Sequence, residues 1–170
     1  MLFLCCISVQ AQLMATYQPV QKQPRVQFDY WVMNTHAGNG TATQYPIVPT
    51  NRTEMDNLFN SANSNTTVYQ TGKTNSARIL DWTSAAELSA IGINLPNSGN
   101  YFGFKIQGTF IPQETGSYTF TLESDDASDL FIDGTSIIGS YIGQAVPNLG
   151  THTGSAILTA GKSYTFQIRM

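Results

Sequence analysis

The segment SDDASDLFIDG, residues 124–134, carries four aspartates and no lysine or arginine. Asp125 and Asp126 are adjacent and directly follow SYTFTLE, an alternating run that is typical of a half-buried strand. Neighbouring side chains of a regular strand point to opposite faces, so these two carboxylates can grip one ion only if the peptide between them is bent by a bulge or a cis bond. Carboxylates without basic neighbours suit Ca²⁺, which accepts about 6 to 8 oxygen ligands.

A solvated turn is the alternative interpretation of this segment. Aspartates in turns accept hydrogen bonds from nearby backbone amides, and acidic turns outnumber ion sites. The EF-hand pattern with its closing Glu is absent. Asp133, in Asp-Gly, is expected to form a turn and to face its own backbone. On spacing alone, the solvated turn is the simpler interpretation.

Composition indicates a single all-β domain. The chain has 170 residues, of which 11% are charged and 11% aromatic, and such a Thr-, Ser-, Asn- and Gly-rich composition favours strands and turns over helices. No Lys or Arg occurs in residues 106–161, which carry six acids, so the basic stripe that nucleic acid requires is missing and no nucleic-acid partner is expected.

The N-terminus MLFLCCISVQAQ has a short apolar run followed by V-Q-A, which predicts a signal peptide over residues 1–11 with cleavage after Ala11. Because the usual basic start is missing, a fortuitous apolar start is the alternative. The run is much shorter than the ~20 residues that span a bilayer, so no membrane insertion is expected. Cys5 and Cys6 both lie in this segment, so a mature chain would contain no disulfide and no Cys-based metal site.

The rest of the chain divides into two parts of one domain. Residues 12–76 are expected to form a first strand, VQFDYWVM, and then long polar loops. Residues 77–170 are expected to form a β core with one short helix, which begins at the capping-box pair Ser84 and Glu87. Consecutive hairpins with one apolar face each predict an antiparallel β-sandwich or flattened barrel. The predicted core comprises Phe102, Phe104, Phe110, Tyr118, Phe120, Leu122, Tyr164 and Phe166.

Two further features bear on the context of the chain. The sequons at Asn39, Asn51 and Asn65 are candidate N-glycosylation acceptors, although chance sequons are common in Asn- and Thr-rich sequence and a bacterial or phage protein would leave them bare. The last strand stops at Met170 in mid-alternation, which indicates that the β core is truncated at its C-terminus and that further sequence or domains follow in the full-length protein.

The run from about residue 79 to 170 resembles the protective-antigen domain family. The residues that carry the resemblance are Trp82 in ILDW, Leu95-Pro96, the run YFGFKIQGTFIPQETGSYTFTLESDDASDLFIDG, and LTAGKSYTFQIRM. This β module is found in yeast flocculins and epithelial adhesins, in some glycosidases and in bacterial toxins. The resemblance implies a family sandwich fold of the kind already expected from the hairpins.

The resemblance also implies a function. In adhesin members the paired aspartates, here Asp125 and Asp126, are joined by a cis peptide and bind Ca²⁺, through which sugar hydroxyls are held. The expected protein is therefore a calcium-dependent, lectin-like carbohydrate-binding module for adhesion to glycans, secreted or on a particle surface. This chain departs from the family at Ala127, where Gly is usual, and it ends before the loop that supplies further calcium ligands. The candidate aromatic partners for a sugar are Tyr141 or the loop residues near Tyr45.

A non-catalytic structural or interaction module of a larger extracellular, toxin-like or virion protein, without sugar binding, is the alternative function. An enzyme is not expected. His36 and His152 are the only histidines, no nucleophile or carboxylate stands at motif spacing from them, and no hydrolase, zincin or P-loop motif is present. Adjacent aspartates also differ from the two opposed acids, about 5 to 10 Å apart, that a glycosidase needs.

Overall fold

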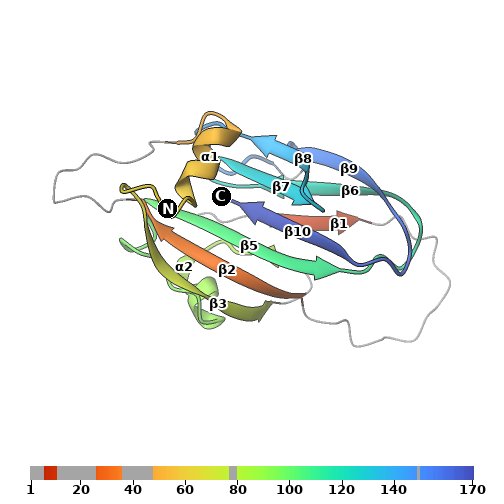
Figure 1. The fold of residues 1–170 in the computed structure, drawn as a ribbon, viewed down its shortest axis with the longest axis horizontal. Coiled ribbons are helices and arrows are strands. Elements are labelled where there is room, and N and C mark those ends of the chain that lie inside the picture. Colours follow the sequence, from red (N-terminus) through yellow and green to blue (C-terminus); the bar gives the residue numbers. More distant parts are fainter. Residues whose placement is uncertain (1–5, 11–25, 36–47, 77–79, 149) are drawn as a thin grey trace.

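The strands of the protein form two antiparallel sheets packed face to face, as the computed structural model shows for residues 6–10, 26–35, 48–76, 80–148 and 150–170 (Figure 1). The four-stranded sheet has the order β4 (Leu80–Asp81), β1 (Cys6–Gln10), β6 (Gly116–Glu123) and β9 (Thr153–Leu158). The six-stranded sheet has the order β3 (Thr67–Ser76), β2 (Val26–Asn34), β5 (Phe102–Phe110), β10 (Tyr164–Arg169), β7 (Ser128–Ile132) and β8 (Thr135–Ser140). The predicted antiparallel β-sandwich is thus confirmed.

The core lies between the two sheets and is built largely from the residues that the alternation predicted. Five of the eight predicted core residues are buried, and these are Phe104, Phe120, Leu122, Tyr164 and Phe166. Three are partly buried at the margin of the same cluster, and these are Phe102, Phe110 and Tyr118. Trp82 joins the core from the segment after β4, and its ring centroid lies 6.0 Å from those of Phe28 and Phe104.

The prediction of one short helix is wrong, because the described residues contain two. Helix α2 (Ala85–Ala90) begins with the predicted capping box, in which Ser84 and Glu87 each accept from the other's backbone amide. Helix α1 (Arg52–Leu58) begins at Asn51, whose side chain accepts from the amide of Glu54. The sequence pattern does not reveal α1, because this helix buries only two residues, Met55 and Leu58.

Part of the polar segment that was expected to be loop is a strand, β3. It pairs with β2 at the edge of the six-stranded sheet, from Thr67 to Ser76, with a register shift between Val32 and Met33. Val68 and Tyr69 of β3 are exposed, and the other residues of this strand are mostly polar. The strand therefore lacks the apolar alternation that reveals strands with a buried face. Backbone pairing and hydrogen bonds such as Thr71 Oγ1 to the Tyr30 carbonyl hold it instead.

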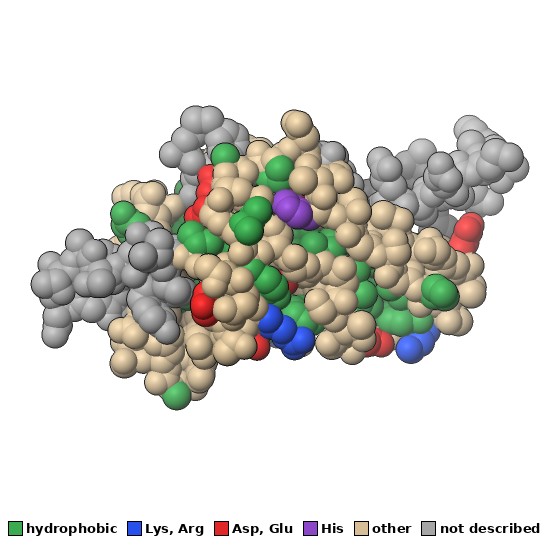
Figure 2. Space-filling view, turned by 90° about the horizontal axis from the view of Figure 1, so that it is seen from above, with side chains coloured by type: hydrophobic (Ala, Val, Ile, Leu, Met, Phe, Trp, Pro, Cys, Tyr) green, Lys and Arg blue, Asp and Glu red, His purple; other side chains and the backbone are tan. Residues whose placement is uncertain are grey.

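Strand β1 lies within the segment that was expected to be a signal peptide. Its five residues pair with β6 from Cys6 opposite Glu123 to Gln10 opposite Thr119, and two of them also pair with β4. Cleavage after Ala11 therefore stays a prediction, and it would remove one strand of the four-stranded sheet. In the described part of the chain, neither helix has the length and apolarity needed to cross a bilayer. The face shown in Figure 2 consists mainly of uncharged polar and backbone atoms, with scattered acidic and basic side chains.

Candidate functional site

Asp125 and Asp126 occupy the turn between β6, which ends at Glu123, and β7, which begins at Ser128. The peptide bond that joins them is cis, as the family resemblance implies. The Asp125 side chain is partly buried and Asp126 is exposed. Ser124 is fully buried beneath them, and its hydroxyl donates to the Asp126 carbonyl at 2.7 Å. The turn is therefore held from below while its carboxylates remain accessible.

The two carboxylates repel each other. The pKa of Asp125 lies above its usual value because of partial burial and, next, because of the neighbouring charge of Asp126. Among the described residues, no Lys, Arg or His forms an ion pair with either aspartate. A cation placed between them would relieve this repulsion.

The connection between β8 and β9 forms a second wall of this site. The backbone amide of Gln144 donates to Asp126 Oδ1 at 3.1 Å, and its side-chain amide donates to the Ser124 carbonyl at 3.3 Å. A Cβ at Gly143 would lie 3.8 Å from Asp126 Oδ1, so the loop backbone comes close to the carboxylate. Sequence analysis did not find Gln144, because nothing in its local pattern links it to a turn 20 residues earlier.

The buried carboxylate of Glu123 also binds the connection between β8 and β9 through hydrogen bonds. Glu123 is 1% exposed, and its Oε1 accepts from the backbone amides of Gly150 and His152, both at 3.0 Å. Its Oε2 lies 2.9 Å from His152 Nδ1, and His152 Nε2 lies 3.2 Å from the hydroxyl of Ser140. No nucleophile or carboxylate stands at motif spacing from His152 in the sequence, but the fold brings Ser140 and Glu123 to its two ring nitrogens. Because Glu123 and Ser140 are both buried, we interpret the cluster as a structural attachment of the connection to β6.

A second buried network lies beneath α1. Arg169 Nε and Nη2 donate to the two carboxylate oxygens of Asp129 at 2.9 and 2.6 Å, and Nη1 donates to Asp56. The Tyr141 hydroxyl donates to Asp129 at 2.9 Å, and burial together with the Asp129 charge raises the Tyr141 pKa to about 12. Tyr141 is therefore fastened to the scaffold, and its expected role in stacking on a sugar stays a prediction. Sequence spacing could not reveal this network, because its members come from α1, β7, β10 and a loop.

The carboxylate oxygens of the Asp125–Asp126 turn are of the chemical type that binds a hard cation. Carboxylate oxygens are the ligands that Ca²⁺ prefers, and Asp126 keeps Oδ2 free of hydrogen bonds from the described residues. The described residues contain no cluster of three or more His, Cys, Asp or Glu side chains that could hold a metal. Ala127 adopts no positive φ, and its methyl packs in a small buried cluster with Met55 and Leu58, so it is accommodated where the family usually has Gly.

The other candidate residues lie apart from this turn. Asn51 caps α1, and Asn65 is exposed in the turn before β3. Asp133 has a φ of 46° at the tip of the β7–β8 hairpin. Its carboxylate accepts from the amide and hydroxyl of Thr165 on β10, so the expectation that it faces its own backbone is wrong. Asn39, Tyr45 and His36 lie outside the described residues.

Comparison with known proteins finds a family model that matches part of the chain and solved structures with a similar fold. The family model described as the PA14 domain matches residues 89–170. The PA14 domain of the MpAFP antifreeze protein is similar in structure, with a TM-score of 0.51 and 15% identity, over 89% of this chain and 79% of that one. No curated protein matches the sequence.

Two larger proteins match with lower TM-scores. An anti-sigma factor domain-containing protein from Clostridium clariflavum has a TM-score of 0.49 and 17% identity over 85% of this chain and 36% of that one. A β-glucosidase from Kluyveromyces marxianus, solved in complex with glucose, has a TM-score of 0.46 and 14% identity over 84% of this chain and 14% of that one. The chain thus spans little more than a third of the first protein and about a seventh of the second.

Proposed function

Residues 89–170 of this chain match the family model of the PA14 domain, and on that premise we propose that the protein is a Ca²⁺-dependent carbohydrate-binding module of a secreted or surface protein. The observation that carries the proposal is the turn at Asp125 and Asp126, where two adjacent carboxylates stand without a basic partner among the described residues. The proposed role is binding without catalysis, within a longer protein.

Asp125 and Asp126 are the residues that would hold the ion. When bound, Ca²⁺ supplies coordination positions at which vicinal sugar hydroxyls can replace water. The residues of the chain orient the site: Ser124 holds the Asp126 carbonyl from below, and the Gln144 amide directs Asp126 Oδ1. Of the oxygens on these carboxylates, the described residues hydrogen-bond only Asp126 Oδ1, so the others remain accessible to a cation.

Calcium is expected to stabilise the folded protein, because a cation relieves the repulsion between the two carboxylates. At a free concentration of 100 times its dissociation constant, the ion should add about 2.7 kcal/mol to the free energy of unfolding. Thermal melts with calcium and with a chelator measure this difference. The variant Asp126→Asn should lose the calcium response and be at least as stable as the parent protein in chelator.

The matched control is Asp81→Asn, which alters an exposed aspartate on β4 and should retain the full calcium response. A glycan array probed with calcium and with chelator then tests sugar binding. Identical melts with calcium and with chelator would show that Asp125 and Asp126 bind no calcium. A calcium response without glycan binding in either condition would favour the alternative, a structural or interaction module.

A further inference from the structure

A polar groove crosses the outer face of the six-stranded sheet, on the side away from the core. It has a volume of about 290 Å³, close to the lower end of the ~300–1,000 Å³ range of small-molecule sites. Its lining includes Arg52 and Asp56 of α1, Gln107 of β5, Phe131 of β7, and Thr165, Gln167 and Arg169 of β10. Asp125 and Asp126 are not among the residues that line it. The groove is therefore a site separate from the calcium turn.

Two side-chain amides stand side by side in this groove. Gln107 and Gln167 are directly opposite each other on β5 and β10, and Gln167 is also paired with Phe131 on β7. None of the described residues hydrogen-bonds either side-chain amide, although Gln167 is only partly exposed. A glutamine amide offers both donors and an acceptor, and sugar hydroxyls match such a combination. The pair is therefore available to hold a polyhydroxylated ring.

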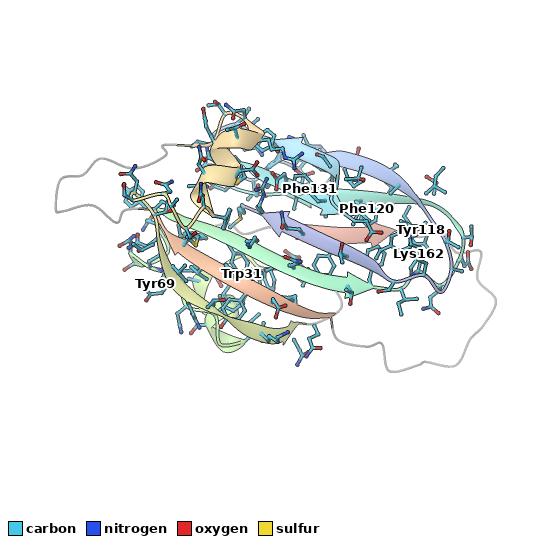
Figure 3. All side chains as sticks on the ribbon, in the orientation of Figure 1. Trp31, Tyr69, Tyr118, Phe120, Phe131 and Lys162 are labelled. Carbon is cyan, nitrogen blue, oxygen red and sulfur yellow. The ribbon has the colours of Figure 1, made fainter. Side chains whose placement is uncertain are left out.

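Aromatic rings and cations flank the amides. Phe131 and Trp31 lie on β7 and β2, on either side of β5 and β10 (Figure 3). The Arg52 guanidinium carbon lies 4.6 Å from the centroid of the Phe131 ring. The Lys105 ammonium lies 3.9 Å from the centroid of the Trp31 ring, on the same face as Gln107 and two residues from it along β5. Each ring thus lies against a cation: Arg52 is part of the groove lining, whereas Lys105 lies next to the groove along β5.

One cation beside the groove, Lys105, has no acidic partner among the described residues. Arg169 pairs with Asp129 and Asp56, and Arg52 Nε lies 3.8 Å from Asp56 Oδ2. By contrast, no carboxylate of the described residues lies within ion-pair distance of Lys105. Partial burial and the nearby Arg169, directly opposite on β10, lower the pKa of Lys105. A ligand carboxylate beside Lys105 would supply the missing negative charge.

We propose that this groove binds a saccharide that carries a carboxylate, of the uronic acid class. Gln107, Gln167 and Thr165 hold its hydroxyls, and Lys105 holds its carboxylate. The binding needs no calcium, because none of these side chains takes part in the Asp125–Asp126 turn.

Calorimetric titration with an oligogalacturonate in the presence of a chelator tests the proposal. The protein should bind the acid and should bind its methyl ester, which has the same rings without the charge, much more weakly. Replacing both amides, Gln107→Ala with Gln167→Ala, should weaken binding of the acid about tenfold, because it removes hydrogen bonds to the ring hydroxyls. Lys105→Gln should reduce the affinity for the acid to nearly that for the ester.

Gln113→Ala is the matched control, since Gln113 is an exposed glutamine in the turn after β5, and it should bind like the parent protein. Asp126→Asn should also bind like the parent, which separates this site from the calcium turn. Melting temperatures of all variants establish that they are folded. Absence of binding, equal affinity for acid and ester, or full affinity in the double glutamine variant would each overturn the proposal.

Discussion

At the scale of single residues, Asp125 makes the stability of the calcium-free protein depend on pH. Its pKa is raised in the folded protein by partial burial and by Asp126, so the folded state holds this proton more tightly than the unfolded chain does. The contribution of Asp125 to stability is therefore present at low pH. It is lost as the pH rises from the unfolded pKa through the raised folded pKa.

We accordingly expect Asp125→Asn to be more stable than the parent protein in chelator at neutral pH, and to lose this advantage on acidification. The calcium response should fade over the same acidic range, because a protonated Asp125 binds the ion poorly. Carboxyl NMR titration checks the cause directly: Asp126→Asn should lower the Asp125 pKa and Asp81→Asn should not. An Asp125 titration that is unchanged by Asp126→Asn would contradict the proposed repulsion.

At the scale of elements, Glu123 at the end of β6 fastens the connection between β8 and β9, which also carries Gln144. In Glu123→Gln, the uncharged amide accepts more weakly from the amides of Gly150 and His152, and its NH₂ group faces His152 Nδ1. We expect a loss of about 1–3 kcal/mol in the free energy of unfolding, measured by urea denaturation.

Hydrogen exchange locates the effect of this substitution. The amides of Gly150 and His152 should exchange faster, and the calcium response should weaken because the Gln144 amide no longer directs Asp126 as firmly. Glu114→Gln is the matched control, since Glu114 is exposed in the β5–β6 turn and no side-chain hydrogen bond to its carboxylate is formed by the described residues. Unchanged exchange at both amides would show that Glu123 does not hold this connection.

At the scale of the whole molecule, the N-terminal segment has two roles that exclude each other. Signal cleavage in a secreting host should leave a chain that begins at Gln12, whereas the fold uses Cys6–Gln10 as β1 beside β6. Mass spectrometry of the secreted protein decides between them, and retention of Cys5 and Cys6 would reject cleavage. Melting residues 1–170 and 12–170 under the same conditions then measures what β1 contributes to the sandwich.

Local sequence was sufficient to predict much of this molecule. Alternating apolar residues predicted β5, β6, β10 and the core between the sheets, since burial of one strand face requires a period of two. The capping box predicted the start of α2, because both of its hydrogen bonds lie within four residues. The acidic turn was predicted from the adjacent residues Asp125 and Asp126, and its calcium-binding role remains a prediction.

Tertiary structure decided which distant side chains meet. Glu123 and His152, Asp129 and Arg169, and Gln107 and Gln167 are each brought together by strand order and register, which no local pattern encodes. Strand β3 and helix α1 escaped prediction for a related reason: an edge strand and a short surface helix bury too few apolar side chains to leave a periodic signal. Periodicity thus reports burial, whereas the binding surfaces depend on polar residues whose positions only the folded chain determines.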